Sequence, residues 1–334
     1  MVLHIRIIGR AGRITLARPQ ALNALTHDMA LAIHRALDDW QGNDAVALVV
    51  IDAEGDRAFC AGGDIAAVYH AGLAGDHQLG RDFFRDEYRM NAAIADFPKP
   101  IVAFMQGFVM GGGVGVGGHA SHRIVGDTTR IAMPESGIGL IPDVGGTWLL
   151  SRAPGRIGEY LALTGARMGP GDAIHAGFAD LFIPEADWPA LITALERDGD
   201  VGVLRGQPAP AATLDRRDLS AFGARTLPEI VAALEASGDT EALAPLRRNA
   251  PLSMAAGLAM VRAARADTRM QQSLSREFRF TARSTADSDF LEGVRAQIID
   301  KDRQPVWRHD PTEDKLRAML APLGDDELLW EDSE

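Results

Sequence analysis

Three consecutive glycines, Gly111 to Gly113, and two later carboxylates, Glu135 and Asp143, are the residues of this chain whose types and spacing best suit catalysis. Because glycine has no Cβ, the backbone can pass close to a ligand with its N–H groups directed at it. Free N–H groups stabilise a developing negative charge, and carboxylates in apolar loops supply an acid, a base or a nucleophile. The pattern predicts a site for a reaction that builds up charge on an oxygen atom.

A second glycine loop, with Gly62 and Gly63 in the stretch AFCAGGDI, has the same surroundings as the first. It follows an apolar, β-branched run at 46–51 and precedes a helical run, while Gly111 to Gly113 follow a similar run at 101–105. Two successive units of strand, glycine loop and helix predict an α/β fold with ligand loops at the carboxyl ends of the strands. The alternative is that both loops are only tight turns.

The two carboxylates have structural alternatives as well. Glu135, in AMPESGIG, is either catalytic or paired with an arginine, and Asp143 stands where it could cap a helix over 144–151. Apolar neighbours surround both in the sequence, which predicts raised pKa values if the carboxyl groups are buried.

Three other patterns near these loops are weaker. Gly113-x-Gly115-x-x-Gly118 matches a dinucleotide-binding pattern, but about five residues then precede the next strand-like stretch, where a crossover helix needs roughly ten or more. Cys60 reads as a small packed residue rather than a nucleophile. His119 and His122 form the only close histidine pair near the glycine loop, and a structural role is expected for them.

Length, net charge and cysteine count exclude some classes of function. The chain has 334 residues, a formal net charge of -12 and a single cysteine. This charge argues against a non-specific nucleic-acid or anionic-membrane binder, and a lone cysteine forms no intrachain disulfide. The N-terminal stretch lacks the apolar core of a signal peptide, which leads us to expect a cytoplasmic protein of bacterial origin. No clustered metal-ligand pattern or membrane span is apparent.

The second half of the chain is helical in pattern. A capping box at Thr226 to Glu229 opens one helix, and 251–266 and 268–283 read as long amphipathic helices. We therefore divide the chain into an α/β core at 1–185, which carries the site, and a helical C-terminal region and tail at 186–334.

The motifs occur together in an order that resembles the crotonase superfamily, also called the enoyl-CoA hydratase/isomerase family. The matching stretches are RPQALNALT, AFCAGGDI, the triple glycine and PDVGGTWLL. FFRDEY around Glu87, MPESGIGLIPDVGG and the block from SLSREFRF to DKDRQPVW are similar to the branch of that family that hydrolyses 3-hydroxyisobutyryl-CoA in valine breakdown.

The resemblance implies a spiral of ββα repeats that holds a CoA thioester. Its carbonyl oxygen would meet the N–H groups of Gly63 and Gly112. By motif position, Glu135 corresponds to the family's catalytic glutamate, Asp143 to a second acidic residue, and Glu87 to a substrate-binding residue. CoA would enter as part of the substrate, with no metal or separate cofactor. The expected partner is this small molecule, with no nucleic acid and no membrane, and assembly into a homo-oligomer is left open.

One position departs from the family's hydratases. They carry a first catalytic glutamate two residues after the triple glycine, where this chain has Gly115. Hydration of a double bond uses two carboxylates on one water molecule, so the resemblance favours hydrolysis of the thioester. The alternatives are an enoyl-CoA isomerase or hydratase of the same superfamily and, in a different class, a non-catalytic binding member.

Overall fold

The computed structural model describes residues 2–330. The chain forms two compact units, each built from three separate stretches. The first unit contains Met1–Asp64, Asp86–Ala132 and Arg167–Arg216, and the second contains Ile65–Arg85, Met133–Ala166 and Arg217–Glu334. A boundary at residue 185 stays a prediction from the sequence. Helix α3 (Gln78–Ala95) contributes its first half to the second unit and its second half to the first.

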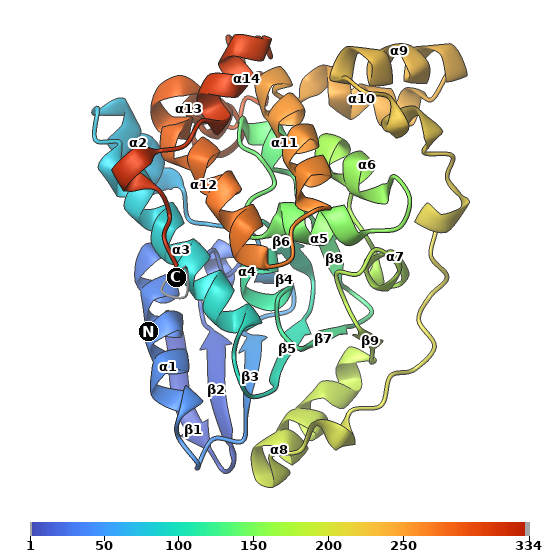
Figure 1. The fold of residues 1–334 in the computed structure, drawn as a ribbon. Helices are drawn as coiled ribbons and strands as arrows, with labels where there is room; N and C mark the ends of the chain where they lie inside the picture. The colour runs from blue at the N-terminus through green and yellow to red at the C-terminus, as the bar shows by residue number, and fades with distance from the viewer. Residues whose placement is uncertain (1, 331–334) are drawn as a thin grey trace. The chain divides into compact units, whose positions relative to one another are not determined.

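A six-stranded sheet forms the larger part of the first unit (Figure 1). Its strands run in the order β1-β2-β3-β5-β7-β9, and only the β1–β2 pair is antiparallel. The strands are β1 (Leu3–Ile8), β2 (Ala11–Leu16), β3 (Leu48–Ala53), β5 (Ile101–Met105), β7 (His122–Val125) and β9 (Leu181–Phe182). The strand-like runs predicted at 46–51 and 101–105 correspond to β3 and β5, which are parallel neighbours in this sheet.

Helices cover both faces of this sheet. Helix α1 (His27–Gln41) begins after Thr26, whose hydroxyl accepts a hydrogen bond from Met29 N, and packs the ring of Trp40 over Gly12 on one face. Helix α8 (Trp188–Asp198) covers the opposite face, where apolar side chains alternate with those that face α1. The core on the α8 side includes Ala11, Leu48, Val50, Val102, Phe104, Ile124, Trp188, Ile192 and Leu195.

A smaller parallel sheet in the same unit carries the glycine loops. It consists of β4 (Ala58–Cys60), β6 (Phe108–Met110) and β8 (Arg130–Ala132), in that order. Since β4 and β6 are parallel neighbours, the loops that follow them leave the same edge of the sheet. Short helix α4 (Gly112–Gly117) begins directly within the second glycine loop.

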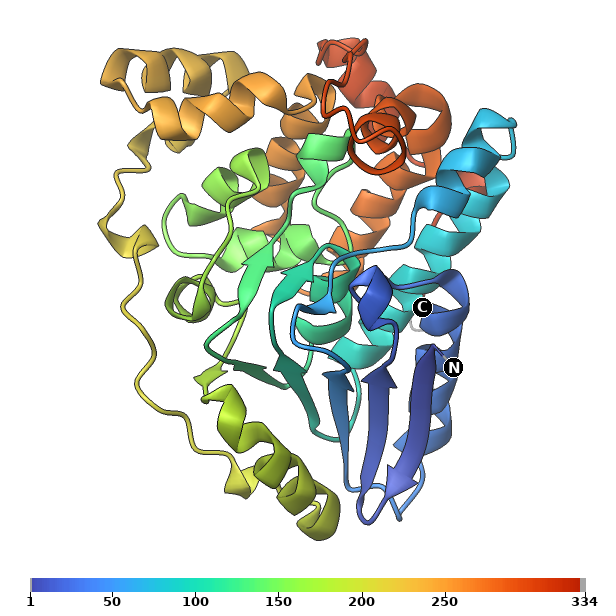
Figure 2. The ribbon, with the colours of Figure 1, turned by 180° about the vertical axis from the view of Figure 1, so that it is seen from behind.

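After α8 the chain of the first unit becomes an extended connector with short 3-10 turns, drawn in yellow-green in Figure 2. Its one strand-like contact is the bond from Gln207 N to Phe182 O at 2.8 Å. Helix α7 (Pro170–His175) precedes β9 in this unit.

Helices make up the second unit in the part of the chain that the structure describes. They are α2 (Ala66–Leu73), α5 (Gly146–Arg152), α6 (Ile157–Thr164), α9 (Leu227–Ser237), α10 (Thr240–Arg248), α11 (Pro251–Ala264), α12 (Met270–Asp287), α13 (Phe290–Val294) and α14 (Glu313–Leu320). The predicted capping box of Thr226 and Glu229 is present at the start of α9. Helix α11 packs on α5 and α6, and α12 packs on α14. No helix within 2–330 is long and apolar enough to cross a bilayer.

Candidate active site

The glycine loop that contains Gly62 and Gly63 is held by the stretch that precedes α1. Arg18 donates to Ala24 O at 2.6 Å and to the Asp64 carboxylate at 2.9 Å. The backbone of Leu25 in turn bonds to both sides of Gly63, donating to Gly62 O at 2.9 Å and accepting from Asp64 N at 2.8 Å. Asp64 precedes α2 (Ala66–Leu73) but does not cap it, because its carboxylate pairs with Arg18 at 2.9 Å.

Asn23 ties the same stretch to the ends of strands β3 and β4. It is fully buried, and its side-chain amide donates to Glu54 O and Ala58 O, both at 2.9 Å. Its side-chain oxygen accepts from Arg18 N at 2.8 Å. Asn23 also adopts a φ of 55°, a left-handed conformation that asparagine tolerates better than most residues. One buried side chain thus ties the stretch that contacts the Gly63 loop to the residues on either side of the β3–β4 connection.

Gly63, Gly112 and Glu87 lie together in the first unit. A Cβ at Gly112 would sit 2.7 Å from Glu87 Oε1 and 3.2 Å from Gly63 N, so any side chain there would displace the Glu87 carboxylate and crowd Gly63. Gly112 is also the first residue of α4, so its N–H has no acceptor within that helix. Outside helices and strands, no backbone hydrogen bond within 2–330 uses the N–H of Gly63 or Gly112. Gly63 N lies close to Gly112, and two N–H groups without a backbone acceptor within that range suit a site that binds an oxyanion; these roles stay predictions.

Cys60 lies under this loop as a packed thiol. Burial raises its pKa to about 12, and the charge of Glu87 adds to the shift while a hydrogen bond to Gly62 opposes it. The thiol is fully buried and contacts Gly62 O at 3.5 Å. At neutral pH it carries no thiolate to attack a substrate.

Glu135 lies in the second unit, at the start of a 3-10 turn, Glu135–Ile138. Its side chain is buried, with 5% of its surface exposed. The next residue, Ser136, is anchored to the chain before α11, because its hydroxyl accepts from the Asn249 amide at 3.1 Å and its carbonyl accepts from Ala250 N at 2.9 Å. The turn that presents Glu135 is therefore fixed by residues more than 100 positions later in the chain.

Helix α13 packs directly against the far end of the same turn. Gly139 has a φ of 74°, and a Cβ there would lie 2.5 Å from Asp289 O. A Cβ at Gly293 would collide with Ile138 O. The backbones of the turn and of α13 are too close to leave room for a side chain. Helix α13, in the C-terminal block of the sequence, therefore packs directly against the turn that carries Glu135.

Asp143 follows in the same segment and is also buried, with 4% of its surface exposed. The residue after it, Val144, has a φ of 54°, and Gly145 has a φ of 76°. Helix α5 begins only at Gly146, with Gly145 as its N-cap and no side chain in the capping position. The alternative that Asp143 caps this helix is therefore wrong.

Glu277, on α12, is a residue of this region that the sequence reading missed. It is fully buried, and its carboxylate accepts from Gly145 N at 2.8 Å, from Thr147 N at 3.0 Å and from the Thr147 hydroxyl. Burial raises its pKa from 4.5 to about 7, the charge of Asp143 adds to the shift, and the hydrogen bonds oppose it. The available signal was an acidic residue on the apolar face of a predicted amphipathic helix.

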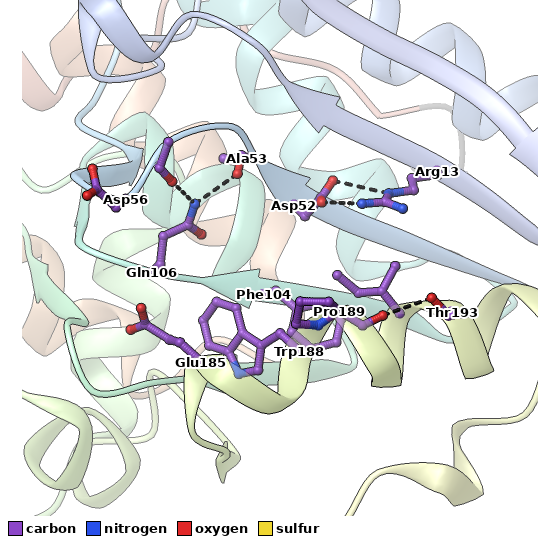
Figure 3. Close-up of a pocket in the computed structure, with 12 residues that line it drawn as sticks. Arg13, Asp52, Ala53, Asp56, Phe104, Gln106, Glu185, Trp188, Pro189 and Thr193 are labelled. Atoms are coloured by element: carbon purple, nitrogen blue, oxygen red, sulfur yellow. Dashed lines mark hydrogen bonds and ion pairs between the residues drawn. The ribbon is translucent and has the colours of Figure 1, made fainter.

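A separate cavity of about 470 Å³ lies between α8 and the large sheet of the first unit (Figure 3). Asp52 there is paired with Arg13 at 2.6 Å, and Gln106 donates to Ala53 O and Gly55 O. Glu185 accepts from Thr128 N at 2.8 Å. None of the predicted site residues lines this cavity, and these polar side chains already bond to protein groups.

At the position of the hydratases' first glutamate the structure has buried Gly115, inside α4. With neighbours Val114 and Val116 also buried, no carboxylate is supplied from this helix. Nor do residues 2–330 hold a cluster of three or more His, Cys, Asp and Glu side chains placed to bind a metal.

Comparison with known proteins places these features in one family. The sequence model described as "Enoyl-CoA hydratase/isomerase" matches residues 11–323. The chain belongs to that family. The predicted crotonase resemblance and the α/β crotonase fold are thereby confirmed, and a solved structure described as an enoyl-CoA hydratase from Rhodobacter sphaeroides superposes with a TM-score of 0.95. That structure is 57% identical, over 99% of this chain and 100% of its own.

Curated members of the family point to a branch. The 3-hydroxyisobutyryl-CoA hydrolase of Xenopus tropicalis is 38% identical over 96% of this chain and 89% of its own length. The enzyme of that name from Homo sapiens is 35% identical over the same shares. Both are named as mitochondrial, so our expectation of a cytoplasmic, bacterial protein is contradicted. It rested on a missing apolar leader, and that absence carries no information about the compartment.

Proposed function

We propose that this chain is an acyl-CoA thioester hydrolase that converts 3-hydroxyisobutyryl-CoA and water to 3-hydroxyisobutyrate and CoA, a step of valine breakdown. The observation that carries the proposal is Gly115, buried where the family's hydratases need a carboxylate, in a chain that keeps Glu135 and Asp143 buried in one segment. The relatives named as 3-hydroxyisobutyryl-CoA hydrolases support the acyl group.

The N–H groups of Gly63 and Gly112 would stabilise the oxyanion of the tetrahedral intermediate. In measured cases a donor of this kind lowers the reaction barrier by roughly 2.7 to 4 kcal/mol. The closeness of Gly63 N to Gly112 supports this role, and Glu87 beside them would bind the substrate.

Glu135 would either take a proton from water as it attacks the thioester carbon, or attack that carbon itself. In the first route the new bond is between the water oxygen and the carbonyl carbon, the C–S bond breaks, and the thiolate of CoA takes up a proton. In the second route an anhydride with Glu135 forms as the thiolate leaves, and water then opens it. Asp143 would orient the substrate hydroxyl or the water. It would also help to pass a proton to the sulfur of the leaving CoA. CoA enters as part of the substrate, and neither route uses a metal or a separate cofactor.

Hydration or isomerisation of an enoyl-CoA is the second candidate. It is favoured by the solved structure described as an enoyl-CoA hydratase, to which this chain is 57% identical. Gly115 argues against hydration, because it removes one of two carboxylates that act on the water. Isomerisation needs only one residue to move a proton and stays open to test.

One experiment separates these candidates. Release of free thiol is followed with 3-hydroxyisobutyryl-CoA, 3-hydroxypropionyl-CoA and isobutyryl-CoA, while hydration is followed with crotonyl-CoA and movement of the double bond with a 3-enoyl-CoA. We expect rapid thiol release from the hydroxylated substrates and slow hydration. Hydration or isomerisation without thiol release would reject the proposal, and no turnover of any substrate would favour a binding protein.

A further inference from the structure

We infer that Glu277 is a positioning residue for Asp143. It holds the turn at 143–147 in the conformation that directs the Asp143 carboxylate, and it acts through the backbone of that turn. The inference rests on the proposed function, because it concerns how one of the proposed catalytic carboxylates is held.

Glu277 accepts hydrogen bonds from Gly145 and Thr147, which follow the strained Val144 in the chain. One carboxylate oxygen accepts from Gly145 N, and the other accepts from Thr147 N and the Thr147 hydroxyl. These N–H groups belong to the N-cap and first turn of α5, where no acceptor exists within the helix. Glu277 thus serves as a cap supplied by another helix, 130 residues later in the sequence.

The turn needs such a restraint because its backbone is strained. Val144 is β-branched and has a φ of 54°, a conformation that is unfavourable for such a side chain. Strained backbone persists only where the surroundings impose it, and it gathers at functional sites. Since Val144 directly follows Asp143, relaxation of its φ would rotate the peptide that carries the catalytic carboxylate.

The choice of a carboxylate at 277 is costly for stability. Glu277 is fully buried, and within 2–330 the hydrogen-bond partners of its carboxylate oxygens all lie in the turn. It also faces the like charge of Asp143. Glu159, a fully buried glutamate on α6, is by contrast paired with Arg156 at 2.9 Å and Arg265 at 2.8 Å. A buried carboxylate without an arginine partner costs stability. We therefore attribute the glutamate at position 277 to the placement of its two acceptor oxygens.

The test compares Glu277→Gln with Glu159→Gln in the full chain. In Glu277→Gln one acceptor oxygen becomes an NH2 group that faces an N–H donor, so the turn relaxes. We expect kcat for thiol release to fall roughly 10- to 100-fold with KM nearly unchanged, since a misplacement of about 1 Å is enough for such a loss. Glu159→Gln removes a buried charge of the same size far along the sequence, and it should lower Tm while kcat is kept.

A double-mutant cycle with Asp143→Asn separates a positioning role of Glu277 from a purely structural one. It measures whether the losses of kcat in the two single variants multiply in the double variant. If Glu277 acts through Asp143, Glu277→Gln should add less than about threefold to the loss already caused by Asp143→Asn. Glu277→Asp, which keeps two acceptor oxygens on a shorter stem, should retain more activity than the glutamine variant. It also carries the test if Glu277→Gln does not fold.

The failures of the two proposals are distinguishable. If the wild-type chain releases no thiol, the proposed function is rejected. If the wild type is active, normal kcat in a folded Glu277→Gln variant overturns the role of Glu277. Losses that multiply in the double variant, or an equal fall in kcat for Glu159→Gln, overturn it as well.

Discussion

The carboxylate of Glu87 lies 2.7 Å from the place that a Cβ at Gly112 would occupy, and Gly63 N lies 3.2 Å from the same place. Glu87, Gly112 and Gly63 of the first unit therefore lie close together, and a side chain at position 112 would displace its neighbours. That convergence is the main structural support for an oxyanion site, and it leads to the first prediction.

Gly112→Ala should lower kcat/KM for thiol release by about 10² or more, because the new methyl group displaces Glu87 and crowds the N–H of Gly63. The measurement is steady-state kinetics with Tm recorded alongside. Gly169→Ala is the matched control, since no atom lies within 4 Å of its added Cβ and its backbone is not in the left-handed region. A folded Gly112→Ala variant with near-normal kinetics would exclude an oxyanion site at Gly112.

Glu135→Gln keeps the size of the side chain but removes its charge. A nucleophile or a general base at this position should lose nearly all turnover, while binding of the thioester persists. Kinetics and direct binding of 3-hydroxyisobutyryl-CoA check this. Retained turnover would remove Glu135 from the chemistry.

Asp143→Asn should fold normally, because α5 is capped by Gly145 and Glu277 rather than by Asp143. We expect kcat to fall by roughly 10² to 10⁴ if Asp143 transfers a proton. Turnover of isobutyryl-CoA, which lacks the hydroxyl, serves as the comparison. An equal defect on both substrates assigns Asp143 to proton transfer, whereas a defect confined to the hydroxylated substrate assigns it to recognition. No defect on either contradicts any role in the reaction.

The raised pKa of Glu277 makes a prediction about stability. Burial first, and then the charge of Asp143, raise this pKa from 4.5 to about 7. Between these values the folded chain binds a proton that the unfolded chain does not, so this group stabilises the fold more at pH 5 than at pH 8. The free energy of unfolding of the wild type minus that of Glu277→Gln should therefore decrease by on the order of 2 to 3 kcal/mol from pH 5 to pH 8. Denaturant unfolding at both pH values measures this, and a difference that is flat or grows with pH would contradict it.

Asn23 should be a stability hot spot of the first unit. Asn23→Ala removes three buried hydrogen bonds and leaves a Cβ-bearing residue without them at a φ of 55°. We expect a loss of roughly 2 to 4 kcal/mol in unfolding free energy. Asn23→Gly loses the same bonds without the strain and should be less affected. Equal stability of the wild type and both variants would show that these bonds do not hold the Gly63 loop.

Local signals carried much of the sequence reading. The glycine loops follow β4 and β6 of the small sheet, not the predicted runs at 46–51 and 101–105, which form β3 and β5 of the large sheet. Runs of β-branched residues nevertheless marked β3 and β5, and the Thr226 capping box marked the start of α9. These features depend on residues a few positions apart, so their patterns are readable in one dimension.

Contacts between distant segments were not readable in this way. Glu277 and Gly145 are 132 positions apart, and no sequence pattern near either residue predicts the hydrogen bond between them. The same holds for Asn249, which anchors the Glu135 turn across 113 positions. Asp143 was offered as a helix cap because an acidic residue precedes a helix, yet α5 begins only at Gly146 and has Gly145 at its N-cap position.

Thiol release from 3-hydroxyisobutyryl-CoA, set against hydration of crotonyl-CoA by the same preparation, tests the proposed hydrolase most directly. With Gly115 in place of a second water-activating carboxylate, we expect release of free CoA to be faster than hydration by at least ~10². Hydration as fast as thiol release, or hydration with no thiol released, would contradict the assignment of this chain as a thioester hydrolase.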